Sequence, residues 1–434
     1  MSAMYRHERE FVRTFFTSPT AVEGDDSAKM LRKAGQLRGM QAADVWVPDN
    51  EDATAPSMRD EGVENIIDVV SEHGGEFPGE IHPRIVWHRD DPTTRHQGFD
   101  HMMRLADPEA GAVQHIDGFV VPEVGAIDDW KKADEFITIV ETEHGLEEGS
   151  LAMSVIVESG VAELALADLR EEMGKPSNNL ERMFLLVDGE VDYTKDMRAM
   201  TPTGGLPPWP ELRHNTSRGA SANGLIAVDG PYDDIRDVEG YRERMTENRA
   251  KGMLGIWSLT PGQVEIANTA PLPPERGSYL LDVGGEDVTL SPREDGTQVY
   301  AGDDLQVEEL DGGRYRLHTG NGERELDADE LREEFKARLD YVPSMNDIVD
   351  SMEEFEAAKE AGRGAISMER TATVVVDGVE VEVTRDRMWD EATYQAAQTP
   401  VHLFQEVYEH RPDQRGELEE MYGESVVERA LNVG

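Results

Sequence analysis

The stretch "MSVIVESGVAEL" (Met153–Leu164) places a carboxylate directly after an apolar run rich in β-branched residues. Met153–Val157 has the composition of a strand buried on both faces, as in the parallel sheets of α/β proteins. Glu158 ends that run, where a buried charge that has lost its partner costs about 3–5 kcal/mol. The stretch therefore predicts a buried strand that ends in a carboxylate in need of a partner.

Eight such apolar runs recur in the first part of the chain, and polar segments with helical spacing, such as "DDWKKADEFITIVETEHG", separate them. This alternation indicates a parallel sheet covered by helices. Eight units within residues 1–270 predict a closed (β/α)8 TIM barrel, with a doubly wound sheet as the alternative. The active site of such a barrel lies where the strands end. The runs are Val12–Pro19, Asp44–Asp49, Arg84–His88, Gly118–Val124, Met153–Ser159, Met183–Gly189, Gly224–Gly230 and Met253–Pro261.

The composition changes after the Pro-rich segment "NTAPLPPERG" near residue 270. Short alternating runs such as "SYLLDV" and "RYRLHT", separated by Gly-containing turns, predict a small antiparallel β insertion over residues 271–330. Residues 331–434 are expected to be mainly helical, with a hairpin at "TATVVVDGVEVEVT". The barrel, rather than these additions, is expected to carry the metal and substrate site.

The charge of the chain limits its environment and partners. Among 434 residues, 90 Asp and Glu face 42 Lys and Arg, which gives a net charge of −48. Such self-repulsion is tolerable where salt screens it, so a salt-rich cytoplasm is predicted. The same charge argues against nucleic acid or an anionic membrane as a partner, and no signal peptide or membrane span is evident. The absence of cysteine excludes thiolate metal sites and cysteine nucleophiles.

Glu158 and Asp192 are 34 residues apart, about one βα unit, so they are expected to end adjacent strands and converge. Two carboxylates at one point repel unless a cation joins them, and oxygen ligands select a hard ion such as Mg²⁺. Gly189 allows a sharp turn that aims the amides of residues 190–192 at a small anion. The alternatives are two ordinary solvated acids and a simple strand-to-helix turn with Asp192 or Thr194 as the N-cap.

Arg84 lies in a run predicted to be buried, where a guanidinium needs a partner. One interpretation is that it binds an oxyanion in the mouth of the barrel. The alternative is a structural ion pair with Asp49, Glu51 or Asp52.

The ordered motifs resemble the citrate lyase β-subunit-like enzymes, a family that includes malyl-CoA lyases. The matching pieces include "DNEDATAPSMRDEG", "FVVPEVGAIDD", "IVESGVAEL", "VDGEVDYTKDM", "GLIAVDGPYDDIRDVEGY" and "AKGMLGIWSLTPGQVEIAN", within about residues 10–270. Length, acidity and the β insertion look most like the malate synthases of the halophilic-archaeal type. The segment "DRMWDEATYQAAQ" fits the D-x-A-T motif of malate synthases, whose Asp is the catalytic base.

This resemblance implies Mg²⁺-dependent condensation of acetyl-CoA with glyoxylate, followed by thioester hydrolysis. It implies Asp390 as the base, with Asp386 as the fallback, and Arg84 as the residue that steadies the enolate. It places Mg²⁺ on Glu158 and Asp192. The remaining implied contacts are glyoxylate on the backbone at Gly189, Glu190 and Val191, supporting acids at Glu51 and Asp52, and acetyl-CoA along Thr17, Ser18, Thr260 and Pro261.

The resemblance also implies a homo-oligomer, perhaps a trimer or hexamer, with an active site shared between subunits. Two rival hypotheses remain open at the level of sequence. One is a malyl-CoA or citramalyl-CoA lyase of the same fold that does not hydrolyse the thioester. The other is a CoA-binding regulatory protein that has lost catalysis.

Overall fold

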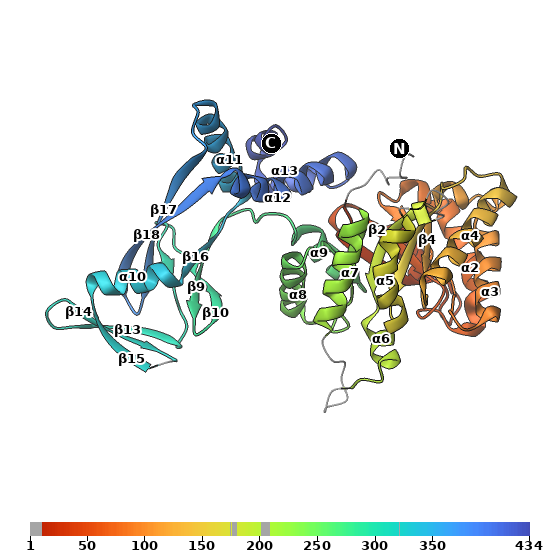
Figure 1. Ribbon diagram of the computed structural model, residues 1–434, viewed down its shortest axis with the longest axis horizontal. Coiled ribbons are helices and arrows are strands. Elements are labelled where there is room, and N and C mark those ends of the chain that lie inside the picture. Colours follow the sequence, from red (N-terminus) through yellow and green to blue (C-terminus); the bar gives the residue numbers. More distant parts are fainter. Residues whose placement is uncertain (1–10, 174, 176–179, 201–208, 321) are drawn as a thin grey trace. The chain divides into compact units, whose positions relative to one another are not determined.

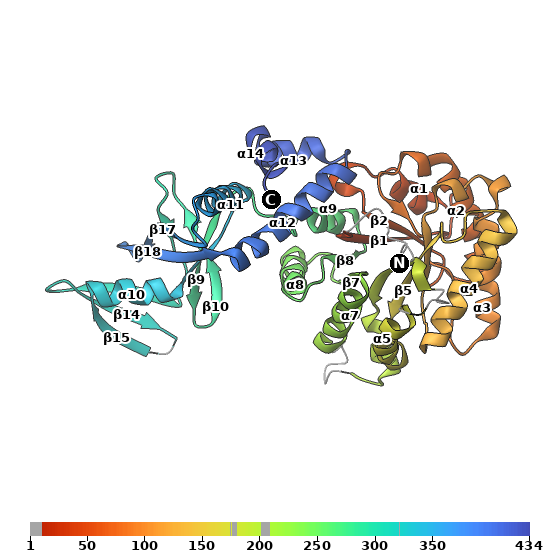
Figure 2. The same cartoon turned by 45° about the horizontal axis from the view of Figure 1, so that its top comes forward.

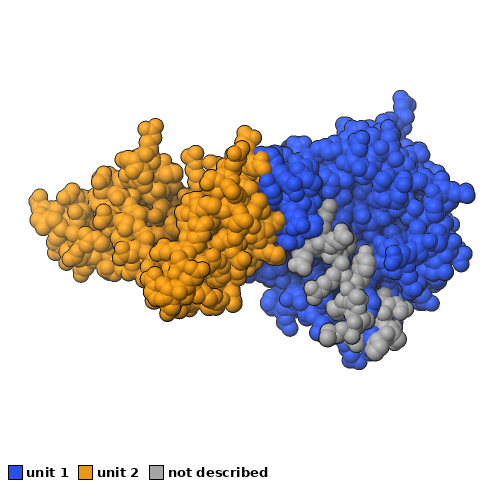
Figure 3. All heavy atoms as spheres, turned by 90° about the horizontal axis from the view of Figure 1, so that it is seen from above, with its two compact units in different colours: residues 1–271, 406–417 blue, residues 272–405, 418–434 orange. Residues whose placement is uncertain are grey.

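The structure is a computed structural model that describes residues 11–173, 175, 180–200, 209–320 and 322–434. The chain forms two compact units, which Figure 3 distinguishes by colour. Unit 1 comprises Met1–Pro271 and Glu406–Glu417, and unit 2 comprises Leu272–Gln405 and Leu418–Gly434. In the described part of the chain, no helix is both long and apolar enough to span a membrane.

Unit 1 is built around eight parallel strands, which lie in the order β3-β2-β1-β8-β7-β6-β5-β4. Each pair of neighbours in that order is parallel, and the predicted (β/α)8 TIM barrel is confirmed. The strands are β1 (Thr14–Pro19), β2 (Val45–Asp49), β3 (Glu80–Ile81), β4 (Gly118–Val121), β5 (Ala152–Val157), β6 (Met183–Asp188), β7 (Ile226–Pro231) and β8 (Gly255–Ser258).

The barrel closes at its irregular third strand. The prediction of a strand at Arg84–His88 is wrong in its bounds, because regular pairing is confined to β3 (Glu80–Ile81). Pro83 has no N–H to donate, which interrupts the ladder on the side of β4, whereas the N–H groups of His82 and Arg84 still donate to the carbonyls of Trp46 and Pro48 in β2. Arg84 resumes the pairing on both sides through isolated parallel bridges to Asp49 and Val120. These bridges join the two edges of the sheet and bring the Arg84 side chain to the end of the barrel.

Helices surround the strands, as Figure 2 shows for α1–α5 and α7. Side chains alternate along each strand, so that Ile156 and Val187 belong to one apolar cluster while Val155 and Leu186 belong to another. The second cluster includes apolar residues of the helices, as expected for a sheet buried on both faces. The helices are α1 (Lys29–Gly35), α2 (Arg59–His73), α3 (Pro92–Leu105), α4 (Ile127–His144), α5 (Gly160–Met173), α6 (Glu190–Asp196), α7 (Pro210–Asn223), α8 (Val238–Ala250) and α9 (Pro261–Thr269).

Unit 2 contains the predicted antiparallel strands and C-terminal helices (Figure 1). Its sheets have the orders β10-β9-β16, β11-β12-β17-β18 and β13-β14-β15. The strands are β9 (Ser278–Val283), β10 (Glu286–Thr289), β11 (Ser291–Pro292), β12 (Gln298–Val299), β13 (Leu305–Leu310), β14 (Arg314–Thr319), β15 (Gly322–Asp327), β16 (Leu339–Val342), β17 (Ala365–Val376) and β18 (Val379–Asp390). The helices that begin in this unit are α10 (Ala328–Arg338), α11 (Met345–Glu360), α12 (Glu391–His410) and α14 (Glu424–Ala430), and α13 (Arg415–Tyr422) bridges the boundary at residue 417.

Candidate active site

Arg84 is the centre of a group of carboxylates at the C-terminal end of the barrel. Its side chain is 3% exposed, and its guanidinium lies 3.3 Å from Asp49, 2.6 Å from Glu51 and 3.0 Å from Asp52. The structural ion pairs considered for Arg84 are therefore all present. Its Nε is buried and has no hydrogen-bond partner among the described residues. One N–H thus remains to donate to a ligand.

Glu158 lies beside this group and is 3% exposed. Burial raises the pKa of its carboxyl to about 8, and the charges of Asp192 and Glu123 act in the same direction. The Arg84 guanidinium and the backbone N–H of Glu123, which donates to Oε1, oppose that shift in pKa. The partners of Glu158 in the protein therefore do not compensate its charge, as expected for a carboxylate that binds a cation.

Asp192 is the third residue of α6, and its side chain is 26% exposed. Its carboxylate pairs with Lys195 at 3.3 Å, and its charge acts on Glu158. Strands β5 and β6 are neighbours, with Val157 opposite Asp188, so the predicted convergence of Glu158 and Asp192 follows from the register.

Gly189 allows the close approach of these two segments. A Cβ at this position would lie 2.4 Å from the Cβ of Glu158, so any other residue would displace the carboxylate. The N–H of Gly189 donates to the Val157 carbonyl at 3.1 Å and is thus occupied by the sheet. The amides of Glu190 and Val191 belong to the first turn of α6, where N–H groups have no partner within the helix. The predicted amide contact is therefore narrowed to these two residues.

The donor set fits a hard divalent cation. Glu158, Asp192 and their neighbours offer only carboxylate and carbonyl oxygens, the ligands that Mg²⁺ prefers. Burial also raises the pKa of Glu51 to about 8, against the opposing charge of Arg84, and Asp52 and Asp49 add to the rise. The mouth of the barrel therefore holds more carboxylate charge than Arg84 alone can balance.

The residues assigned to acetyl-CoA lie at the ends of β1 and β8. The hydroxyl oxygens of Thr17 and Ser18 accept hydrogen bonds from the indole N–H groups of Trp257 and Trp46, each at 2.9 Å. Thr260 is the N-cap of α9 and accepts from the N–H of Gln263 at 3.2 Å, and Pro261 is the first residue of that helix. These hydroxyls therefore already accept one bond each, and their own hydrogens remain to donate.

Asp390 belongs to unit 2, where it ends β18 and precedes α12. Its carboxylate accepts from the N–H of Thr393 at 2.9 Å and from the Thr393 hydroxyl at 3.1 Å. These bonds lower the pKa of Asp390, so its exposed carboxylate is ionised at neutral pH. The Thr of the D-x-A-T pattern thus fixes the Asp side chain as an N-cap. An N-cap is also the ordinary structural role of an Asp at the start of a helix.

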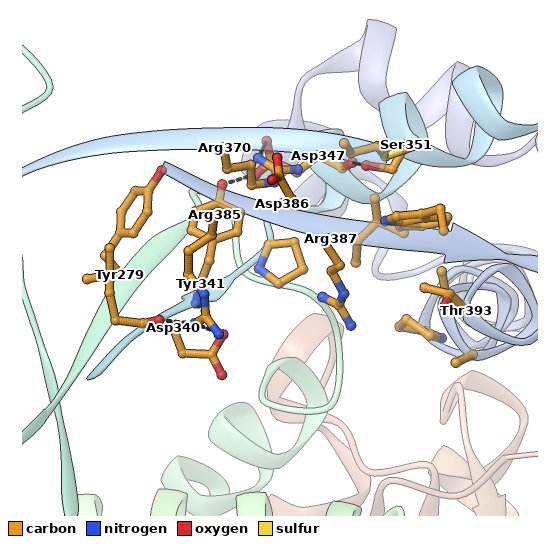
Figure 4. A pocket seen from close by; sticks show the side chains of 18 residues that line it. Tyr279, Asp340, Tyr341, Asp347, Ser351, Arg370, Arg385, Asp386, Arg387 and Thr393 are labelled. Carbon is orange, nitrogen blue, oxygen red and sulfur yellow. Dashed lines mark hydrogen bonds and ion pairs between the residues drawn. The ribbon is translucent and has the colours of Figure 1, made fainter. Parts of the chain in front are cut away.

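A cavity of about 560 Å³ lies next to this cap, within unit 2 (Figure 4). Its wall includes Thr393, Trp389 and the fallback base Asp386. Figure 4 shows Arg385 beside Asp340, whereas Arg387 extends from β18 without a drawn ion pair. The cavity therefore combines apolar wall with an exposed cation.

Two residues of the site were not predicted as such. Glu123 lies two residues after the end of β4, and its backbone holds the left-handed φ of +45° while its N–H donates to Glu158. The 35-residue separation from Glu158, one βα unit, was the available signal. The Trp257 ring lies 5.5 Å from the Arg84 guanidinium, and nothing in its local sequence indicated that contact.

The barrel and its carboxylate-lined mouth place the chain among enzymes that use a hard cation at a C-terminal barrel face. The model "Malate synthase H C-terminal domain" matches residues 279–395. The chain is 75% identical over its whole length to an apparent malate synthase of Haloarcula marismortui that it covers completely. It is 75% identical to the malate synthase of Haloferax volcanii, with 99% of each chain covered. The chain therefore belongs to the malate synthases of the halophilic-archaeal type, within the citrate lyase β-subunit and malyl-CoA lyase superfamily.

Solved structures of the Haloferax volcanii enzyme agree with this assignment. Its magnesium/glyoxylate complex is 65% identical and its pyruvate/acetyl-CoA ternary complex 70% identical to this chain. Each has a TM-score of 0.61 and covers 99% of this chain and 100% of the solved one.

Proposed function

We propose that this malate synthase binds Mg²⁺ through Glu158 and Asp192 and condenses glyoxylate with acetyl-CoA in the mouth of its barrel. The observation that carries this assignment is Glu158, a buried carboxylate whose pKa is raised to about 8 beside a second carboxylate. The magnesium/glyoxylate complex of the Haloferax volcanii relative supports Mg²⁺ and glyoxylate as the metal and the substrate of this chain.

The chain's own residues bind and orient glyoxylate. The amides of Glu190 and Val191, at the turn that Gly189 permits, donate to the glyoxylate carboxylate. When bound, Mg²⁺ supplies Lewis-acid polarisation of the aldehyde. Asp49, Glu51 and Asp52 hold the guanidinium of Arg84 in a fixed position, so its donors are already oriented before the substrate binds.

Asp390 acts as the general base. Its ionised carboxylate removes a proton from the methyl group of acetyl-CoA, and Arg84 donates a hydrogen bond to the enolate oxygen that develops. The methyl carbon then forms a bond to the aldehyde carbon of glyoxylate. Water cleaves the thioester and gives malate and free CoA. Positioned proton transfer of this kind accelerates reactions about 10²–10⁴-fold.

Acetyl-CoA extends over Thr17, Ser18, Thr260 and Pro261. The hydroxyls of Thr17, Ser18 and Thr260 can donate to its polar groups, and the Pro261 ring offers an apolar contact. The cavity beside Thr393 is a further place where part of acetyl-CoA could bind close to Asp390. Its volume of about 560 Å³ is larger than glyoxylate needs, and Arg387 in its wall supplies positive charge. The pyruvate/acetyl-CoA complex of the Haloferax volcanii relative supports acetyl-CoA as the second substrate.

The metal ligands belong to unit 1 and the base belongs to unit 2. From the family resemblance we infer a homo-oligomer, a trimer or hexamer, with an active site shared between subunits. The net charge of −48 suits a salt-rich cytoplasm, where screening reduces self-repulsion.

Asp390→Asn tests the base. In several-molar KCl with Mg²⁺, kcat should fall about 10²–10⁴-fold while glyoxylate binding, measured by calorimetry, stays within about twofold. Asp386→Asn is the matched control, because it removes an exposed carboxylate four residues earlier on the same strand and should retain activity. An active Asp390→Asn and an inactive Asp386→Asn would move the base to Asp386. Mixing the inactive Asp390→Asn and Glu158→Gln proteins should restore some release of free CoA, and no recovery would contradict a shared site.

A further inference from the structure

A second buried group of charges lies directly behind the proposed metal ligands. Glu190 is the first residue of α6, and its carboxylate lies 2.6 Å from Arg213 of α7 and 3.0 Å from Arg244 of α8. The same two arginines also bind Asp229 of β7. Arg213 Nε lies 3.1 Å and Arg244 Nη2 lies 2.8 Å from Asp229 Oδ1. Two cations thus bind two carboxylates on different elements.

This group is almost completely closed to solvent. Asp229 is 0% exposed, Arg213 is 6% exposed and the Arg244 side chain is 14% exposed. Asn248 donates to the remaining Asp229 oxygen at 2.6 Å. Burial alone raises the pKa of Asp229, but Arg244 and Arg213 outweigh it and lower that pKa, so the carboxylate is ionised.

The elements that the group connects include the one that carries Asp192. Strand β6 leads through Gly189 into α6, so Glu190 is separated from Asp192 by a single residue. Strand β7 pairs with β6, with Val228 opposite Val187, and it carries Asp229 at its end. The later residues of α6 have contacts of their own, since the Tyr193 hydroxyl donates to Glu163 and the Thr194 hydroxyl accepts from the Trp209 indole N–H. The two arginines instead hold Glu190, the first residue of the helix.

The energetics of buried ion pairs favour orientation rather than stability as the role of this group. Replacing a buried ion pair by well-packed apolar residues is often neutral or stabilising, so such a network contributes little to stability that an apolar core would not. Its advantage is that hydrogen bonds fix one geometry, and the geometry fixed here is that of the turn leading to Asp192. Partners that orient a metal ligand typically change metal affinity about 10–100-fold when they are removed.

We propose that Arg244 and Arg213 are positioning residues that hold Glu190, and through it the first turn of α6, so that Asp192 faces Glu158. This inference rests on the proposed metal site. Neither arginine is assigned a contact with substrate. Their contribution is the position of a ligand, and it should appear as metal affinity.

Arg244→Met tests the inference, and Arg182→Met is its matched control. Arg182 directly precedes β6, and it also binds two buried carboxylates, Asp134 and, at 2.7 Å, Glu141. The Arg182→Met substitution therefore removes the same kind of contact at the opposite end of β6. We expect Arg244→Met to weaken Mg²⁺ binding in the presence of glyoxylate about 10–100-fold by calorimetry. Arg182→Met should lower Tm and leave the Mg²⁺ affinity within about threefold.

The result that would overturn the inference is Mg²⁺ binding by folded Arg244→Met at wild-type affinity, or an equal loss of affinity in Arg182→Met. Should Arg244→Met fail to fold, Glu190→Gln carries the same test, because it keeps the side-chain shape and removes the charge that the arginines hold. Glu158→Gln is measured in parallel. If that variant binds Mg²⁺ normally, the proposed metal site itself is wrong, and this outcome differs from a failure confined to Arg244.

Discussion

The two ends of the barrel unit carry buried ion clusters of opposite composition. At the N-terminal ends of the strands, one carboxylate, Asp44, lies 2.8 Å from Arg13 and 2.5 Å from Arg411, and all three side chains are 0% exposed. At the C-terminal ends, one guanidinium, Arg84, is shared by Asp49, Glu51 and Asp52. Arg411 also pairs with Asp413 at 3.0 Å, so each carboxylate of the first cluster has a guanidinium of its own. In the second cluster three carboxylates share one guanidinium.

The direction of the pKa shifts follows this difference. Burial alone raises the pKa of Asp44, but Arg13 and Arg411 outweigh it and hold that pKa well below its usual range. Burial raises the pKa of Glu158 to about 8, and the Arg84 guanidinium, which also pairs with Asp49, Glu51 and Asp52, opposes this rise without outweighing it. The first cluster is satisfied within the protein and is structural. The second cluster holds carboxylates that its one arginine does not balance, and this imbalance is what the proposed metal site would use.

The largest expected effect is that of Glu158→Gln. Removing this ligand should lower kcat/KM about 10³-fold, which corresponds to about 4 kcal/mol of transition-state stabilisation. The same variant should be at least as stable as the wild type without Mg²⁺, because the raised pKa shows that the fold disfavours the charged form. Mg²⁺ at about 100 times its Kd should stabilise the wild type by about 2.7 kcal/mol and leave the variant unchanged in thermal unfolding.

The opposite pattern is expected at the other end. Asp44→Asn removes the carboxylate that Arg13 and Arg411 share, while Arg411 keeps Asp413 at 3.0 Å. Loss of one partner from a buried pair costs about 3–5 kcal/mol. An amide oxygen can still accept from Arg13, so a loss of about 3 kcal/mol is expected in denaturant unfolding. The kcat of the folded fraction should stay within about twofold. A stable, inactive Asp44→Asn protein would break the distinction between a structural end and a functional end.

The sequence predicts the barrel well because each strand is decided locally. Buried parallel strands are continuous apolar runs, and β5, β6 and β7 lie where such runs occur. The third strand differs because Pro83 interrupts the ladder, so the apolar run and the paired residues do not coincide. The hairpin predicted over residues 371–384 is longer in the structure, where it comprises all of β17 and β18. Its outer residues are polar and resemble a loop in sequence, but their backbones pair as strands.

The candidate site is predictable from the sequence only where residues one βα unit apart in the chain are also neighbours in the barrel. Glu158 directly follows β5, and Asp192 lies in the first turn after the neighbouring strand β6, so a separation of one βα unit was sufficient to pair them. Asp49, Glu51 and Asp52, which the sequence offered as partners of Arg84, all pair with it, because they lie at or just after the end of β2, the strand beside β3. Asp390 lies in a local pattern that also describes an N-cap, and the structure shows that cap. Its assignment as the base therefore depends on the family resemblance and not on local geometry.

The smallest expected effect distinguishes two explanations of the pKa shifts. One is the ratio of carboxylates to arginines in a cluster, and the other is the end of the barrel at which the cluster lies. Asp134 shares Arg182 with Glu141, at the same end as Asp44, yet here two carboxylates share one guanidinium. Burial raises the pKa of Asp134 to about 7, against the opposing charge of Arg182, with Glu141 adding to the rise. The folded state then binds a proton more tightly than the unfolded state, for which the pKa is 3.8. The stability that this proton contributes is complete below pH 3.8 and is lost as pH rises through about 7.

Between pH 5 and pH 8, Asp134 should therefore reduce the free energy of unfolding by on the order of 1 kcal/mol, and Asp134→Asn should remove that slope. Denaturant unfolding across this range, at constant KCl, measures it. Asp44→Asn provides the comparison, because a lowered pKa leaves the contribution of Asp44 constant throughout the same range and the variant should lose stability without a change of slope. If Asp134→Asn keeps the wild-type slope, then position in the barrel, and not the ratio of carboxylates to arginines, sets the pKa of these buried groups.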